Sequence, residues 1–217
     1  AFNVGVSPSG HGFFAAAPRL LVWGGAAARA RQLEWIDLET RARSTVGEPA
    51  DIWQARLSPD DRSAAVTLLD PLLRTLDVFV LPLSGSVVPR RLTRAIAADS
   101  DPVWSEDGDR VLFRSLQGGQ PNLFARAVDG DGSAEDTIMR SELDETATDW
   151  RDGTVLLQAP ANGALDLWTF EQERSSVTEI TSGGFNEFGG RWSPDQHLLA
   201  YVSDESGRPD IYVAPWP

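Results

Sequence analysis

The 217-residue sequence contains no cysteine, and all 19 of its basic residues are arginine. Without cysteine there is no disulfide, thiol catalysis or cysteine-ligated metal site, and the redox compartment stays undetermined. Without lysine there is no P-loop, Schiff-base or kinase-type catalytic lysine. Histidine occurs only at His11 and His197. Histidine, the residue that most often acts in general acid–base catalysis, is therefore scarce, whereas carboxylates are plentiful.

Long apolar runs are also missing. No stretch reaches 18 apolar residues, so no membrane-spanning helix is predicted. The first residues lack the basic start and apolar core of a signal peptide. The localisation stays open between the cytoplasm and the bacterial periplasm or another extracytoplasmic compartment. The net charge of −13 argues against nucleic acid and an anionic membrane surface as partners, and it permits a basic protein or peptide.

An internal repeat is the strongest pattern in the sequence. Five segments begin with a polar residue and continue into apolar or aromatic residues, and they start at positions 32, 77, 122, 166 and 210. The spacings are 45, 45, 44 and 44 residues. A turn rich in serine, proline, aspartate and glycine precedes each segment, at 7–10, 58–61, 105–108, 150–153 and 193–196. Short runs bounded by such turns are typical of β-strands.

The repeat predicts an all-β fold. A unit of about 44 residues with four antiparallel strands is typical of a β-propeller blade, in which neighbouring blades cover each other's faces. We therefore expect residues 1–217 to form a single five-bladed propeller domain. The expected blades are about 7–49, 50–97, 98–142, 143–184, and 185–217 together with a strand at 1–6.

Several phrases carry a family resemblance. RLSPDDRSAAV, DPVWSEDGDRVLFRS, GGQPNLFARAVDG and RWSPDQHLLAYVSDESGRPDIYVAPWP resemble the TolB-type, WD-like propeller repeat. The last phrase is also similar to propeller segments attached to some bacterial serine/threonine kinases. The resemblance covers about residues 50–217, whereas the first repeat is degenerate. It implies the blade fold and says little about function, because these residues build blades.

The strand count leaves two interpretations of the ring. The last repeat ends after its third strand, and residues 1–6 can supply the fourth, with 12–17 and 19–23 as the first two strands of blade 1. In the other interpretation Phe2–Val6 is the inner strand of blade 1, and the chain is part of a six- or seven-bladed ring or half of an assembled pair. A closed ring predicts a monomer, and an incomplete one predicts self-association.

Six acidic residues precede the predicted inner strands and are the candidate ligand-binding residues. Loops at this place face the mouth of the channel in a propeller, where acids would attract a cation or a basic peptide. In the alternative, they accept backbone hydrogen bonds within turns and between blades. The six are Asp51, Asp99, Asp101, Asp144, Glu145 and Glu187.

No catalytic residue, metal site or cofactor is predicted, although a channel cation is permitted. Asp129–Glu135 has the alternating oxygens that begin a calcium loop, but Ala134 takes the glycine position and Arg140 the glutamate position. Both histidines lie in predicted loops. Arg90, Arg91 and Arg94 form a basic cluster expected on a solvated edge strand.

The eight tryptophans are Trp23, Trp35, Trp53, Trp104, Trp150, Trp168, Trp192 and Trp216. Most occupy equivalent repeat positions, which predicts packing between blades. Trp216 lies outside the repeat, and it either packs on the last blade or marks a docking place.

Three functions fit these patterns. The first is a non-catalytic binding module that contacts a ligand or protein through the channel mouth and rim loops. The second is a hydrolase or lyase in the channel, which rests on fold analogy and lacks a Gly-x-Ser-x-Gly elbow. The third is a fragment of a larger propeller that closes by self-association.

Overall fold

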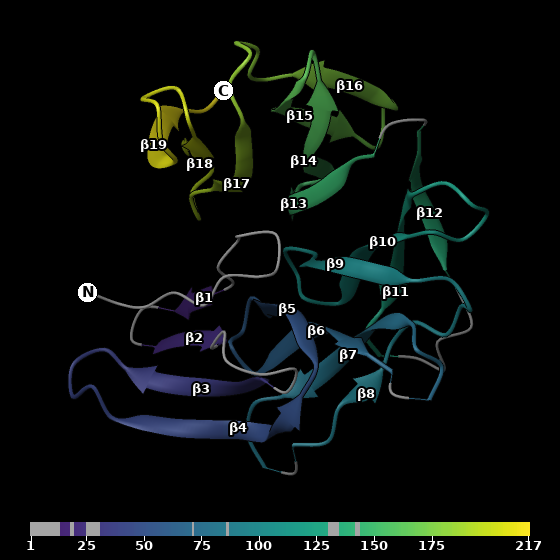
Figure 1. The fold of residues 1–217 in the computed structure, drawn as a ribbon, viewed down its shortest axis with the longest axis vertical. Coiled ribbons are helices and arrows are strands. Elements are labelled where there is room, and N and C mark those ends of the chain that lie inside the picture. The colour runs from purple at the N-terminus through teal and green to yellow at the C-terminus, as the bar shows by residue number, and fades with distance from the viewer. Residues whose placement is uncertain are drawn as a thin grey trace.

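The computed structural model describes residues 14–17, 20–24, 31–70, 72–85, 87–129, 135–141 and 144–217, the first two ranges by their backbone alone. All regular secondary structure in these ranges is β-strand. The strands form five antiparallel sheets, and in each sheet the strands pair in the order of the chain (Figure 1). These ranges contain no helix that is long and apolar enough to cross a membrane.

Four of the sheets have four strands each. The first contains β1 (Phe14–Ala17), β2 (Leu20–Gly24), β3 (Arg31–Asp37) and β4 (Arg43–Ala50). The second contains β5 (Ile52–Leu57), β6 (Ser63–Leu69), β7 (Leu76–Pro82) and β8 (Arg90–Arg91). The third contains β9 (Asp99–Trp104), β10 (Arg110–Ser115), β11 (Asn122–Ala127) and β12 (Asp136–Arg140). The fourth contains β13 (Thr146–Arg151), β14 (Thr154–Ala161), β15 (Ala164–Glu171) and β16 (Ser176–Glu179).

The fifth sheet contains β17 (Glu187–Trp192), β18 (Leu198–Ser203) and β19 (Asp210–Pro215). The predicted all-β propeller is confirmed, but the prediction of five repeats with four strands each is wrong in its strand count. In the described part of the chain the last sheet has three strands, and β19 pairs with β18 alone. Residues 1–6, which were expected to add the fourth strand, lie outside the described residues.

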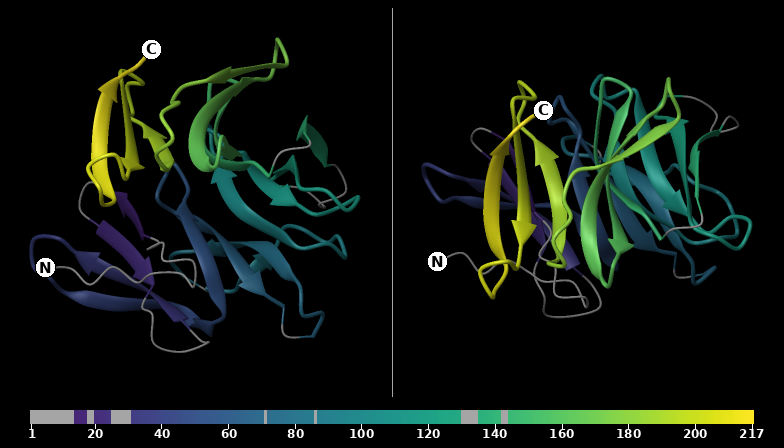
Figure 2. Two further views of the ribbon diagram at one scale, coloured as in Figure 1. Left: turned by 45° about the horizontal axis from the view of Figure 1, so that its top comes forward. Right: turned by 90° about the horizontal axis from the view of Figure 1, so that it is seen from above.

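The first strand of each sheet lies on the inside of the propeller. Strands β1, β5, β9, β13 and β17 contact one another in succession, and the sheets fan out from them (Figures 1 and 2). The inner strand of the first sheet is therefore β1, whereas the competing interpretation placed Phe2–Val6 there. Four of the inner strands, β5, β9, β13 and β17, contain a bulge or register shift, which increases the local twist.

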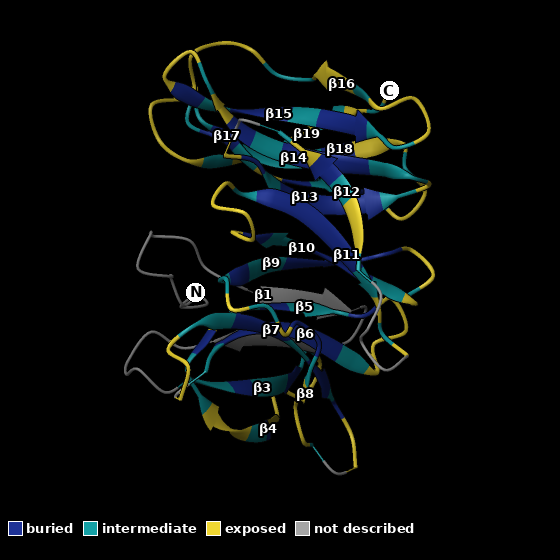
Figure 3. Cartoon of the chain, turned by 90° about the vertical axis from the view of Figure 1, so that its right-hand side faces the viewer, coloured by how far each residue is buried: buried dark blue, intermediate teal, exposed yellow. Residues whose placement is uncertain are grey.

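The core lies between neighbouring sheets, with one apolar cluster at each of four interfaces. Leu33 packs with Val66 between the first two sheets, and Val80 packs with Phe113 between the next two. Leu112 and Leu157 join the third sheet to the fourth, and Leu167 and Leu199 are in the cluster that joins the fourth to the fifth. Figure 3 shows the buried residues concentrated on inner and middle strands, with exposed residues on β4, β12 and β16.

The turn between the first two strands of a sheet is fixed by a serine and an aspartate. The Ser58 hydroxyl donates to Asp60 Oδ1 over 2.6 Å and accepts the Ser63 N–H over 3.0 Å. Ser105 and Asp107 repeat this contact, as do Ser193 and Asp195. The fourth sheet departs from the pattern: Asp152 and Gly153, both with positive φ, form a two-residue hairpin directly after Arg151.

Candidate functional site

A cavity of about 370 Å³ lies where four inner strands end. We call it the axial cavity, because its walls come from sheets on different sides of the ring. Its lining residues are Arg56, Leu57, Pro59, Val103, Trp104, Ser105, Glu106, Asp149, Trp150, Arg151, Arg191 and Trp192. Arg56 and Arg191 belong to the second and fifth sheets, which are not neighbours along the chain. The cavity therefore brings together residues far apart in the sequence.

The repeat explains why tryptophans and charged residues alternate here. Trp104, Trp150 and Trp192 end or nearly end their inner strands, and all three are buried. The Trp104 indole N–H donates to the Arg56 carbonyl over 2.9 Å, which ties the third sheet to the second. The residue just before each tryptophan is Val103, Asp149 or Arg191, and Arg56 precedes Leu57 at the equivalent place. This one repeat position therefore supplies most of the charge in the cavity.

Asp149 is the acceptor at the centre of these charges. Its carboxylate accepts the backbone N–H of Trp150 over 2.9 Å and that of Trp192 over 3.0 Å. Arg151 Nε lies 3.7 Å from it and Arg191 Nη1 lies 4.0 Å from it. Arg151 reaches this place because the short hairpin at Asp152 puts an arginine where other sheets have the turn serine. One carboxylate is therefore shared by two guanidinium groups and two backbone donors.

The arginine charges in the cavity are only partly compensated. Burial, and then the facing charge of Arg191, lower the pKa of Arg56 to about 9, against the opposing effects of Asp101 and Asp149. Burial also lowers the pKa of Arg191, where Asp149 acts in the opposite direction. Both side chains remain cationic at neutral pH. The arrangement can hold an anionic or polar group by charge-assisted hydrogen bonds.

The six acids expected at the channel mouth divide into two groups. Asp99, Glu145 and Glu187 are buried at or next to the starts of inner strands. Asp51 and Asp101 are half-buried, and Asp144 is exposed and pairs with Arg114 over 2.5 Å. Asp101 has a positive φ at the bulge of β9, and its carboxylate accepts a hydrogen bond from Gln54 Nε2. None of the six lines the axial cavity.

The buried acids face polar residues of the preceding sheet. Burial raises the pKa of Asp99 to about 6; the nearby hydroxyl groups of Ser115 and Thr93 act against this, and the nearby Asp77 adds to it. Neither carboxylate oxygen of Asp99 has a hydrogen-bond partner within the described residues. Burial, with Asp166 close by, likewise raises the pKa of Glu187.

At the interface between the third and fourth sheets, Asn122 takes the place of the aspartate. Ser141 links it to Glu145, since the serine N–H donates to Asn122 and its hydroxyl to Glu145. Burial raises the pKa of Glu145 as well. Asp99, Glu145 and Glu187 therefore occupy equivalent places at successive sheet interfaces.

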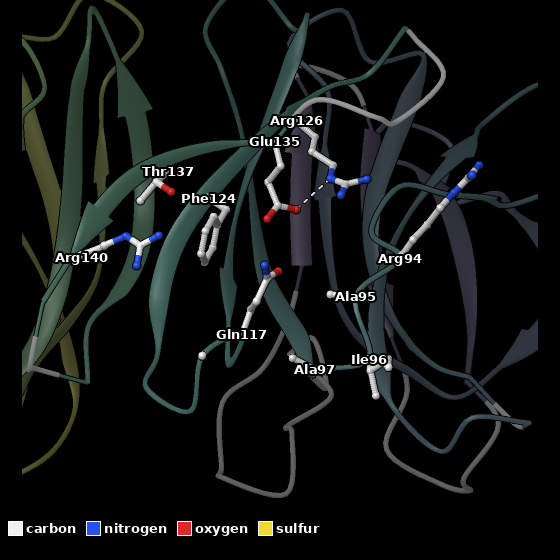
Figure 4. Close-up of a pocket in the computed structure, with 11 residues that line it drawn as sticks. Arg94, Ala95, Ile96, Ala97, Gln117, Phe124, Arg126, Glu135, Thr137 and Arg140 are labelled. Carbon is white, nitrogen blue, oxygen red and sulfur yellow. Dashed lines mark hydrogen bonds and ion pairs between the residues drawn. The ribbon is translucent and has the colours of Figure 1, made fainter.

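A second pocket, of about 740 Å³, opens at the outer side of the second and third sheets. We call it the rim pocket; its lining includes Arg94, Gln117, Phe124, Arg126 and Glu135. Arg126 Nε donates to Glu135 over 2.9 Å, and in Figure 4 the Arg94 side chain points away from this pair. The charges of this pocket do not converge on one place as they do in the axial cavity.

The remaining sequence motifs do not line the axial cavity. His197 lies in an exposed turn, where its N–H donates to Asp195, while His11 lies outside the described residues. The 129–135 segment is described only at its two ends. Trp216 packs on Trp192 at a centroid distance of 5.8 Å. Within the described ranges, no group of three or more histidine, aspartate or glutamate side chains is arranged to hold a metal ion.

Sequence reasoning missed Arg56, Asp149, Arg151 and Arg191. A signal was present for three of them, because Arg56, Asp149 and Arg191 are charged at the repeat position that Val103 occupies, where a blade needs only an apolar residue. The sequence did not show that these positions meet across the axis.

Comparisons with known proteins place the fold among TolB-like propellers. No protein-family model matches the chain. The Tol-Pal system protein TolB of Wolinella succinogenes is 23% identical over 129 residues, which is 57% of this chain and 30% of that protein. The chain thus spans about a third of the length of this relative.

Solved structures agree with the sequence match. TolB of Acinetobacter baumannii superimposes with a TM-score of 0.72 at 18% identity, over 88% of this chain and 47% of that one. An enzyme shares the fold as well: oligogalacturonate lyase of Vibrio parahaemolyticus gives a TM-score of 0.59 at 16% identity, over 98% of this chain and 61% of that one. At these identities the likeness establishes the fold alone.

Proposed function

We propose that this TolB-like propeller is a non-catalytic interaction module, which binds a peptide segment of a partner protein at the axial cavity. The observation that carries the proposal is the convergence of Arg56, Arg151 and Arg191 on a cavity with tryptophan walls. Arginine and tryptophan are the residues that most often dominate protein-binding surfaces. A volume of about 370 Å³ suits one or two side chains better than a whole domain.

The chemistry of the lining supports binding rather than turnover. Its one hydroxyl, on Ser105, donates to Asp107 and accepts the Arg110 N–H, so it is held in the turn. Asp149 is likewise engaged by two backbone N–H groups. Both side chains are therefore engaged in hydrogen bonds of the fold. Neither is available as the nucleophile or the general base that turnover would require. We propose the six acids of the channel mouth and the rim loops as further places of contact with a ligand or partner protein. We propose no metal or cofactor. Attachment to a kinase stays a prediction.

A binding assay on an immobilised random-peptide library tests this proposal. We expect the labelled chain to enrich a set of peptides, and Arg191→Gln to weaken their binding at least tenfold. Arg208→Gln is the matched control, because Arg208 lies in an exposed turn of the same sheet and its side chain is 79% exposed. Equal binding by the parent and Arg191→Gln would exclude the axial cavity as the contact place.

The alternative function is a hydrolase or lyase acting in the channel. The observation in its favour is that guanidinium groups bind carboxylated substrates, and a lyase is among the proteins of similar fold. Incubation with oligogalacturonate separates the two functions, since turnover that is lost in Arg191→Gln would support the enzyme.

We also propose that the ring closes through a fourth strand on β19, with residues 1–6 as the candidate strand. One face of the last sheet packs on the fourth sheet through Leu199, while Leu198, Ile211 and Val213 on the other face are 45%, 75% and 61% exposed. A fourth strand would pair with the edge of β19, which has no strand partner in the described part of the chain, and a closed ring would bring a neighbouring sheet against the exposed apolar face. The alternative is a fragment of a larger propeller that covers this face by self-association.

A further inference from the structure

Positive charge outnumbers buried negative charge in the axial cavity. The lining holds Arg56, Arg151 and Arg191 but only one buried carboxylate, that of Asp149. The other lining acid, Glu106, is 45% exposed at its side chain and lies 4.0 Å from Arg151. The local charge is therefore opposite in sign to the net charge of −13 that the whole chain carries.

Some of the guanidinium donors in this cavity have no acceptor. Arg191 Nη2 and Arg151 Nε are buried, and neither makes a hydrogen bond within the described part of the chain. A buried charged donor without an acceptor is costly, so such groups are normally satisfied by a partner. These two nitrogens come from adjacent sheets and belong to the arginines that share Asp149. They mark a place where an additional acceptor would be stabilised.

The repulsion between the arginines also indicates that the cavity lacks negative charge. Apart from burial, the largest effect that lowers the pKa of Arg56 is the charge of Arg191, which lines the same cavity from the fifth sheet. Arg151 likewise lowers the pKa of Arg191. Asp101, which lies outside the lining, and Asp149 offset only part of this effect on Arg56. An anion between the arginines would relieve the remaining repulsion.

We propose that the axial cavity binds a carboxylate group of its peptide ligand through the guanidinium groups of Arg56, Arg151 and Arg191. This inference rests on the proposed function and names the chemistry of its ligand. A planar guanidinium donates two parallel hydrogen bonds to a carboxylate, a match that an amide oxygen provides only in part. Leu57, Pro59 and the tryptophans form an apolar wall for the rest of the residue. The proposed ligand is thus acidic, whereas the negative net charge and the candidate acids of the sequence indicated a basic partner.

Three acetylated hexapeptides of sequence Gly-Ser-Ala-Xaa-Ala-Ser test this inference and separate the two peptide sources of a carboxylate. The first has glutamine at Xaa and an amidated end, and so carries no carboxylate. The second has glutamate at Xaa and an amidated end, and the third has glutamine and a free carboxyl end. Nuclear magnetic resonance titration to millimolar peptide, followed on the tryptophan indole N–H signals, gives the affinity of each.

We expect one of the two carboxylate peptides to bind at least tenfold more tightly than the neutral peptide. Arg56→Gln and Arg191→Gln should each remove this preference, and Arg208→Gln should keep it. Added salt should weaken the preferred peptide more than the neutral one. Arg56→Gln should also raise the melting temperature, by about 2–4 °C, because one of two facing cations is removed. A retained or raised melting temperature shows that the variant is folded.

The outcomes distinguish this inference from the function on which it rests. If all three peptides bind equally and Arg191→Gln weakens each of them, the carboxylate assignment is overturned and the interaction module stands. If Arg191→Gln leaves every bound peptide unaffected, both are overturned. If no peptide binds at millimolar concentration, the carboxylate assignment is overturned, and the random-peptide assay decides on the interaction module.

Discussion

At the scale of single residues, hydrogen bonds in the first turn of a sheet fix the direction of the strands that follow. The buried Ser58 hydroxyl both donates to Asp60 and accepts the Ser63 N–H. The same hydrogen bond is the largest cause of the lowered pKa of Asp60. The Ser58 hydroxyl therefore provides an acceptor for the backbone N–H of Ser63, at the start of β6.

Replacing this serine should destabilise the chain measurably. We expect Ser58→Ala to lower the free energy of unfolding by about 1–2 kcal/mol, because the Ser63 N–H loses an acceptor in a part-buried place. Urea unfolding followed by circular dichroism gives the value. Ser84→Ala is the control, since Ser84 is exposed in a loop, and it should change the stability by less than about 0.5 kcal/mol. Equal effects of the two changes would contradict this role for the turn serine.

The sequence predicted such turns but not the site residues. Serine, proline, aspartate and glycine have local conformational preferences, so their positions identify a turn without any knowledge of the rest of the chain. The meeting of Arg56 with Arg191 depends on how the second and fifth sheets are arranged around the axis, and no local preference encodes that.

At the scale of strands, the last three sheet interfaces each bury an acidic or amide side chain beside the start of the next inner strand. Asp77, Asn122 and Asp166 begin or nearly begin a third strand, and Asp99, Glu145 and Glu187 belong to the following sheet. The position of the second set before inner strands is visible in the sequence, where it is compatible with ligand binding at the channel mouth or with hydrogen bonds between blades. Period and turn chemistry located the strands, but only the packing of sheets reveals that these acids are buried.

The pH dependence of stability tests this buried array. Since the pKa of Asp99 is raised from 3.8 to about 6 in the folded chain, folding binds a proton between these values. This residue's contribution to stability is therefore largest below about pH 4 and is lost as the pH rises through 6. We expect Asp99→Asn to gain stability relative to the parent across this window, by up to about 3 kcal/mol.

Chemical denaturation at several pH values between 4 and 7 measures the difference. Glu48→Gln is the control, because Glu48 is exposed on β4, away from this interface, and it should not show the gain in stability expected of Asp99→Asn. A constant difference between Asp99→Asn and the parent over the whole window would contradict the buried, protonated state of this acid.

At the scale of the whole molecule, the five sheets fan out from successive inner strands, and the axial cavity exists only because the packing of these sheets brings the ends of their inner strands together. The 44-residue repeat predicted the blades well, since a repeat carries the same strands in every copy. The last repeat ends after its third strand, as the described structure also has it, and the repeat could not say what completes this blade, because the outer strand of a propeller can come from anywhere in the chain and its pairing is not local. The edge of β19, which has no strand partner in the described part of the chain, is the physical reason to expect a fourth strand.

Light-scattering chromatography of this chain, and of the same chain without residues 1–6, is the measurement that tests most directly whether one copy holds this ring together. We expect a monodisperse monomer of about 23.6 kDa for the full sequence, and aggregation or a lower melting temperature for the shortened one. A stable dimer of the full sequence, or a shortened chain that behaves like its parent, would contradict the closed ring. The cover of the last sheet would then have to come from a second copy or from another segment.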